Sequence, residues 1–102
     1  MHSSISQYKL DISNICKRYR VTKLDVFGSA VRKYDFNLAS SDADFLIEFA
    51  PEVRVGLSEF MGIKTELERL LGRTVDLLEP EAIVNPYVLA SIKRNRETVY
   101  AA

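Results

Sequence analysis

The segment from Asp42 to Phe49 alternates polar and apolar residues, and this alternation constrains the fold more than any other feature of the sequence. A period of two is typical of a β-strand with one buried face. Because residues i and i+2 of a strand point the same way, the carboxylates of Asp42 and Asp44 are expected to lie side by side. One face would carry Ala43, Phe45, Ile47 and Phe49, and the other Asp42, Asp44, Leu46 and Glu48.

Two neighbouring carboxylates repel each other, and a divalent cation removes that conflict. Like charges disfavour joint ionisation. Mg²⁺ prefers oxygen ligands and takes only a few of them from protein. A solvated strand end that happens to carry two acids is the common alternative. Asp42 and Asp44 alone therefore leave both a metal site and a plain strand end open.

A second motif ends the preceding apolar run, Leu24 to Phe27, with Gly28 and Ser29. Glycine lets the backbone approach a ligand closely, and free N–H groups at the start of a helix favour phosphate. Ser29 adds a hydroxyl donor, and Arg32, one helical turn further on, can bind phosphate oxygens with its planar guanidinium group. The motif fits a phosphate-binding turn, and it also fits an ordinary strand-to-helix turn with an exposed arginine.

Together the two motifs resemble the signature of the polymerase-β-type nucleotidyltransferases. The matching residues are Gly28-Ser29-x-x-Arg32, followed by Ser41-Asp42-x-Asp44 and an apolar run. In its small size the chain resembles the minimal nucleotidyltransferases, the MNT proteins of HEPN–MNT toxin–antitoxin pairs. The resemblance extends from Val21 to the C-terminal helix. The chain departs from the pattern at Lys33, where members often have glycine, and in a longer segment between the motifs.

Length and composition limit the classes of protein to which the chain can belong. The 102 residues are enough for one hydrophobic core, so residues 1–102 are predicted to form a single domain. Hydrophobic residues make up 47% and charged residues 27%, as in soluble globular proteins. No apolar run approaches the ~20 residues that would span a membrane, and no apolar signal core is present. These features predict a cytoplasmic protein with no membrane contact.

Charge and cysteine content narrow the class further. The formal net charge is zero, which gives no indication of non-specific nucleic-acid binding. Cys16 is the only cysteine, so an internal disulfide is excluded, and its helical context predicts a small core residue. His2 is the only histidine and cannot by itself build a histidine-based zinc site.

The whole chain predicts the order helix, strand, strand, helix, strand, helix. Apolar residues at spacings of three and four indicate amphipathic helices. This order favours an α/β (α+β) fold, a small mixed β-sheet with helices mostly on one face, and the resemblance implies the polymerase-β-like nucleotidyltransferase fold. The predicted elements are a helix over 4–19, a strand over 21–27, a helical turn over 29–34, a polar loop over 34–41, a strand over 42–49, a helix over 57–71, a strand over 73–78 and a last helix from Asn85.

Specific residues mark the helix faces and ends. Gly72 is predicted to cap the C-terminus of the second long helix, and Asn85 followed by Pro86 to begin the last one. Val88, Leu89, Ile92 and Val99 are expected to pack inward. The apolar stripes comprise Ile5, Tyr8, Ile12, Ile15 and Cys16 in the first helix, and Leu57, Phe60, Met61, Leu67, Leu70 and Leu71, interrupted by Lys64, in the second.

Asp76 interrupts the apolar run of the third predicted strand. A carboxylate in a central strand costs free energy unless another group pairs with it. If this strand lies beside the strand with the two acids, Asp76 completes a cluster with Asp42 and Asp44. The resemblance implies the same, because the third carboxylate of the family comes from a later strand of this kind. The alternative is an exposed Asp76 paired with Arg73 or Lys23.

The resemblance implies a metal-dependent nucleotidyltransferase that uses ATP and two Mg²⁺ ions. Two ions about 4 Å apart would clamp the attacking and leaving oxygens. Asp76 would also accept the proton of the attacking hydroxyl. The implied nucleotide-binding residues are Gly28, Ser29, Arg32 and Ser41, and the implied catalytic and metal-binding residues are Asp42, Asp44 and Asp76.

The acceptor is expected to come from outside the chain. Placing a small molecule accurately needs a pocket that buries most of its surface, and a chain of this size has little left to build one. A second copy or a partner protein would supply the acceptor, and the resemblance implies a HEPN toxin modified on a tyrosine hydroxyl. The predicted docking rims are the loop 34–41 and a basic helix face with Lys93, Arg94 and Arg96.

Two other functions are compatible with the same sequence features. The first is a non-catalytic antitoxin, an interaction module that neutralises its partner by binding. The second is a small α/β domain whose acids have no catalytic role. Retention of all three acids together with Ser29 favours the enzyme.

Overall fold

The computed structural model describes residues 3–28 and 43–102 of the chain. Within these ranges the fold confirms the predicted α/β class with a mixed sheet. Its elements are α1 (Ser3–Ser6), α2 (Lys9–Arg18), β1 (Val21–Phe27), β2 (Ala43–Phe49), α3 (Leu57–Leu71), β3 (Val75–Leu78), the short 3₁₀ helix η2 (Pro80–Ala82), α4 (Pro86–Arg94) and β4 (Glu97–Ala101).

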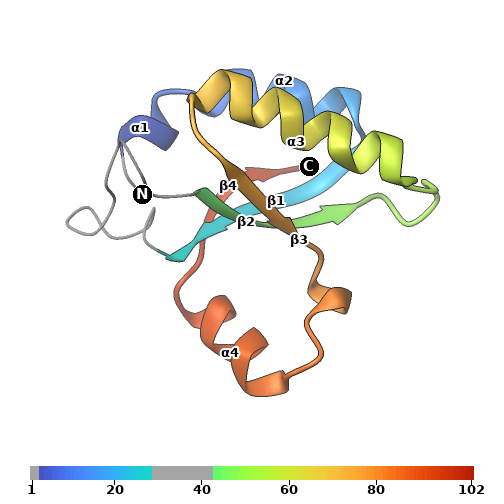
Figure 1. The fold of residues 1–102 in the computed structure, drawn as a ribbon, viewed down its shortest axis with the longest axis vertical. Coiled ribbons are helices and arrows are strands. Elements are labelled where there is room, and N and C mark those ends of the chain that lie inside the picture. The colour runs from blue at the N-terminus through green and yellow to red at the C-terminus, as the bar shows by residue number, and fades with distance from the viewer. Residues whose placement is uncertain (1–2, 29–42) are drawn as a thin grey trace.

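The strands form one sheet in the order β3-β2-β1-β4. Strand β1 pairs antiparallel with both β2 and β4, whereas β2 and β3 are parallel. A parallel pair needs a crossover connection, and α3 provides it. Figure 1 shows α2 and α3 side by side on one face of the sheet, while α4 lies on the opposite side.

The hydrophobic core lies between the sheet and the two long helices. Alternation along each strand sends every second side chain to this side, and α2 and α3 cover it with their apolar stripes. Burying one such side chain contributes about 1.5–3 kcal/mol. The buried core consists of Ile5, Ile12, Ile15, Cys16, Val21, Leu24, Val26, Ala43, Phe45, Ile47, Ile63, Leu67, Val75, Leu77 and Val99.

The first predicted helix is divided in two. A turn at Gln7 and Tyr8 separates α1 from α2. The predicted stripe nevertheless faces the core: Ile5, Ile12, Ile15 and Cys16 are buried, and Tyr8 packs against them. None of the described helices is both long and apolar enough to cross a membrane.

The stripe predicted for α3 is wrong at its start. Leu57 is 78% exposed and Met61 45% exposed, whereas Ile63, which the prediction left out, is fully buried. Positions 57, 61 and 64 form one row of the helix, and positions 60, 63 and 67 form the next. Only the second row faces the sheet. Lys64 marks the outer row, where it forms an ion pair with Glu68 at 3.5 Å.

Both predicted helix caps are confirmed. Gly72 adopts the left-handed conformation, with φ at 68°, and its N–H donates to the carbonyl oxygen of Glu68. The side chain of Asn85 accepts hydrogen bonds from the backbone N–H groups of Tyr87 and Val88, and Pro86 follows as the first helical residue. Both caps could be predicted from the sequence because the capping hydrogen bonds form within a few residues of chain.

The C-terminal segment corrects the prediction. The last helix ends at Arg94, and Glu97–Ala101 forms a fourth strand along β1. Val99 is buried as expected, but it reaches the core from a strand. Helix α4 has no fully buried residue: Val88 is exposed, which contradicts its expected inward packing, whereas Leu89 and Ile92 are half-buried. A five-residue strand next to a helix is too short to show its own period, and its pairing with β1 is what forms it.

Candidate active site

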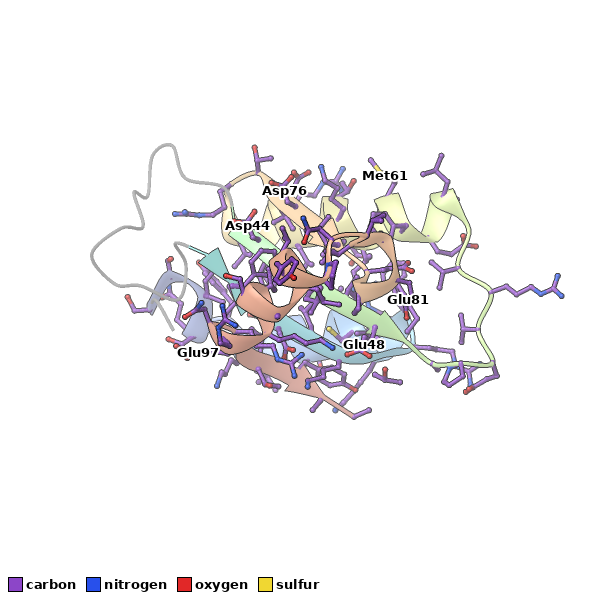
Figure 2. The ribbon with its side chains drawn as sticks, turned by 90° about the horizontal axis from the view of Figure 1, so that it is seen from below. Asp44, Glu48, Met61, Asp76, Glu81 and Glu97 are labelled. Carbon is purple, nitrogen blue, oxygen red and sulfur yellow. The ribbon has the colours of Figure 1, made fainter. Side chains whose placement is uncertain are left out.

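Strands β2 and β3 place two of the predicted acids opposite each other. Asp44 and Asp76 are Cα partners in the parallel register, so their backbones are about 4.8 Å apart, the usual spacing of neighbouring strands. Their strand neighbours Ala43, Phe45, Val75 and Leu77 are buried on the core side. Both carboxylates therefore point to the opposite face, the side of α4, where Figure 2 shows them close to each other.

Asp76 lies on an edge strand, which corrects the prediction of a central one. Strand β3 is the first strand of the sheet and Asp76 is exposed, so its carboxylate has access to water and its desolvation cost is small. The alternative pairing of Asp76 with Lys23 does not form, because the Lys23 Nζ atom lies 3.7 Å from Asp25 instead. The position of Asp76 opposite Asp44 is thus its distinctive feature.

Gly28 brings the end of β1 against the Asp44 carboxylate. Its φ is +70°, a backbone conformation that side chains disfavour, and a Cβ atom there would lie 2.8 Å from Asp44 Oδ2. The register explains this contact, because Phe27, the residue before Gly28, is the Cα partner of Asp44. Glycine is therefore needed for the backbone conformation and also for the space.

The remaining predicted site residues lie outside the described ranges. These are Ser29, Arg32, Ser41 and Asp42, together with the turn over 29–34 and the loop over 34–41. Among residues 3–28 and 43–102, no three histidine, cysteine, aspartate or glutamate side chains are grouped to hold a metal ion. The described part brings together Gly28, Asp44 and Asp76. Its two carboxylates are oxygen donors of the kind that Mg²⁺ prefers, so they fit the metal that the resemblance implies.

The structure adds an acid that the sequence analysis did not select. Asp25 on β1 is only 1% exposed. Its Oδ2 atom accepts a hydrogen bond from Arg96 Nη1 at 3.0 Å. Its Oδ1 atom is buried without a hydrogen-bond partner among the described residues. Asp25 interrupts the apolar run of β1 as Asp76 interrupts that of β3, and this shared signal could have identified it.

The pairing with Asp25 changes the role expected for Arg96. Arg96 stands between α4 and β4, so its bond to β1 fastens this junction to the sheet. Losing one member of a buried ion pair is costly because the other charge stays buried. Arg96 therefore belongs to the fold rather than to a free docking rim. Lys93 and Arg94 remain as exposed basic residues of α4.

Comparison with known proteins points to one family. The model of the nucleotidyltransferase domain family matches residues 10–99. A Methanocaldococcus jannaschii protein named as a protein adenylyltransferase is 35% identical over 78 residues, which cover 76% of this chain and 76% of that protein.

Two solved structures share the fold. A minimal nucleotidyltransferase superposes with a TM-score of 0.76 and 24% identity over 95% of each chain. The second structure is a tri-AMPylated Shewanella oneidensis HEPN toxin in complex with its MNT antitoxin. It matches with a TM-score of 0.64 and 14% identity, covering 94% of this chain and 71% of the matched chain. At these identities the likeness shows the fold.

Proposed function

Because the chain belongs to the nucleotidyltransferase domain family and is thus a nucleotidyltransferase, we propose that it transfers AMP from ATP to a hydroxyl group of a partner protein. The proposed partner is a HEPN-type toxin, which the chain would inactivate as its antitoxin. The observation that carries the proposal is the register of Asp44 opposite Asp76, with Gly28 against the Asp44 carboxylate.

The site residues divide into two roles in this proposal. The backbone at Gly28 and Ser29 binds the triphosphate, assisted by Arg32 and Ser41. Asp42, Asp44 and Asp76 would hold two Mg²⁺ ions, which when bound neutralise charge on the phosphates. Positioning and charge neutralisation supply most of the catalysis in phosphoryl transfer.

Asp76 has a second role as proton acceptor. The acceptor hydroxyl oxygen attacks the α-phosphorus, the bond from that phosphorus to the bridging oxygen breaks, and pyrophosphate leaves. The Asp76 carboxylate takes the hydroxyl proton. Its place on the exposed edge strand suits this role, because an approaching hydroxyl can reach it without displacing any other strand.

A protein acceptor agrees with the openness of this edge. A small alcohol would need a pocket burying most of its surface, whereas a docked protein brings its own rigid surface. The name of the Methanocaldococcus jannaschii relative supports transfer to protein. The AMPylated toxin in the Shewanella oneidensis complex supports a HEPN partner.

The test is transfer of label from α-labelled ATP. The chain, Mg²⁺ and the product of the adjacent reading frame are incubated together, with the Asp44→Asn variant as the control. We expect acid-stable label on the partner with the native chain only, and no modification of aminoglycoside-like alcohols. Partner neutralisation without any label would favour the non-catalytic antitoxin. Efficient turnover of a small alcohol by the chain alone would refute a protein acceptor.

A further inference from the structure

A hollow lies at the other end of β2 from the paired acids. It encloses about 500 Å³ between the end of β2, the segment that follows and η2. Its volume falls within the range of about 300–1,000 Å³ typical of ligand pockets. Its lining includes Glu48, Pro51, Val53, Val55, Glu79 and Glu81.

The hollow combines apolar walls with acidic groups. Pro51, Val53 and Val55 supply apolar wall from the segment after β2. Glu48 comes from β2, and Glu79 and Glu81 come from η2 and the residue before it. In Figure 2, Glu48 and Glu81 are seen from the same side as Asp44 and Asp76, displaced toward the other end of the sheet.

The negative charge of the hollow is not neutralised within the described part of the chain. Glu48, Glu79 and Glu81 make no side-chain hydrogen bond or ion pair with another described residue. Nearby cations do not neutralise it: Lys23, the Cα partner of Glu48, lies against Asp25 at 3.7 Å, and Arg54 is exposed and does not line the hollow. Arg20 pairs with Glu52 at 3.4 Å. The hollow is therefore complementary to a positive charge.

The spacing of the acids indicates a group larger than a bare ion. No three acidic side chains among the described residues converge closely enough to hold a metal ion. A space with apolar walls and separated carboxylates suits a long side chain whose aliphatic part packs against carbon and whose charged end binds oxygen. Arginine and lysine have this structure, and the guanidinium group of arginine can bind a carboxylate through two hydrogen bonds.

We propose that the hollow receives an arginine or lysine side chain of the protein acceptor and thereby selects the protein that is modified. This inference rests on the proposed function, because it concerns the same acceptor. Strand β2 joins the two places: Glu48 lies about 13 Å from Asp44 at about 3.3 Å per residue. In an extended acceptor segment, the basic residue therefore lies about four positions from the modified hydroxyl.

The test is direct binding of a peptide probe, which requires no transfer. The probe is an acetylated, amidated extended pentapeptide with tyrosine first and arginine last, and the matched control has citrulline in place of arginine. Binding to isotope-labelled chain is followed through backbone amide NMR signals. We expect the arginine peptide to shift the signals of residues 48–55 and 79–82. We expect the citrulline peptide to bind about tenfold more weakly, the effect of one charged hydrogen bond.

Variants that remove equal negative charge inside and outside the hollow test whether the arginine peptide binds there. Replacing Glu48, Glu79 and Glu81 by glutamine is expected to weaken the arginine peptide about tenfold or more. Replacing Asp11 by asparagine and Glu59 and Glu66 by glutamine removes the same charge from helices α2 and α3, away from the hollow. This control is expected to bind normally.

Equal binding of the two peptides, or equal weakening in the two sets of variants, would overturn the proposal. Selective binding of the arginine peptide without any transfer of label would support the hollow as a docking site and contradict only the proposed function.

Discussion

The two faces of the sheet differ in what they bury. On the side of α2 and α3, the buried side chains of the strands are all apolar, and Phe45 and Ile47 are completely covered. On the other side the strands bury Leu46 and Asp25 and carry Asp44, Glu48 and Asp76 at partly or fully exposed positions, and the helix on that side, α4, buries no residue. The comparison teaches that one face supplies most of the folding free energy, which leaves the other face able to carry charge and bind ligands.

The largest expected effect tests this division directly. Phe45→Ala removes a fully buried ring and should lower the free energy of unfolding by about 3–5 kcal/mol. Tyr87→Ala, on the 85% exposed ring of α4, should change it by less than about 0.5 kcal/mol. Urea unfolding of both variants measures the difference. Comparable losses would show that α4 contributes to the fold as the core helices do.

The charged face has one structural exception, the Asp25–Arg96 pair. Arg96→Met leaves Asp25 buried with Lys23 as its remaining cation and should cost about 3 kcal/mol. Arg94→Met removes an exposed charge of the same helix region and should cost less than about 0.5 kcal/mol.

The double variant Asp25→Leu with Arg96→Met should recover part of the loss, because it removes the buried carboxylate together with its partner. If Arg96→Met unfolds at the same urea concentration as the native chain, the pair does not fasten the junction.

The next effect concerns activity rather than stability. Asp44→Asn should lower transfer by about a hundredfold or more, since even groups that only orient a metal ligand contribute roughly 10–100-fold. Asp76→Asn should impair transfer more than ATP binding, because its proposed roles are the second ion and the proton. Calorimetric ATP affinity and label transfer measure the two separately. Full transfer by Asp76→Asn would mean that the third acid is another residue.

Substitutions at two glycines with the same backbone conformation distinguish the effect of backbone strain from the effect of a contact with Asp44. Gly28→Ala and Gly72→Ala both place a Cβ at a φ near +70°, which should cost about 1–2 kcal/mol each. Only at Gly28 would the Cβ meet Asp44, since nothing lies within 4 Å of the corresponding point at Gly72. Transfer of label should therefore fall in the Gly28→Ala variant alone. Urea unfolding measures the stability of both variants, and the label-transfer assay measures their activity. An equal fall in both would make the Asp44 contact irrelevant.

The smallest effect is on the core thiol. Burial raises the pKa of Cys16 to about 12, so the folded state holds the thiol proton more tightly than the unfolded state. This stabilising contribution is complete below about pH 8.5 and is lost as pH rises through the folded-state pKa. At pH 8, reaction with a disulfide reagent should require unfolding and be fast only in guanidinium chloride. Rapid reaction of the native chain would show that water reaches this part of the core.

Part of the candidate site could be predicted because its signals are local. Gly28, Asp44 and Asp76 each interrupt or end an apolar run, and the structure brings these three residues together. The two helix caps follow from short-range hydrogen bonds. Asp25 carries the same signal, but only its burial beside Arg96 distinguishes it from an exposed acid. The hollow beside η2 has no sequence signal, because its lining comes from separate segments.

The sequence by itself determined the alternation along β2, the end of α3 at Gly72 and the start of α4 at Asn85, because these depend on neighbours along the chain. Only the tertiary structure decided that Glu97–Ala101 pairs with β1, that Ile63 rather than Met61 faces the core, and that β3 is an edge strand. These outcomes depend on which elements pack against each other. The sequence of a short segment does not determine its packing partner, because conformational preferences of a few tenths of a kcal/mol are outweighed by the free energy of burying apolar side chains against that partner.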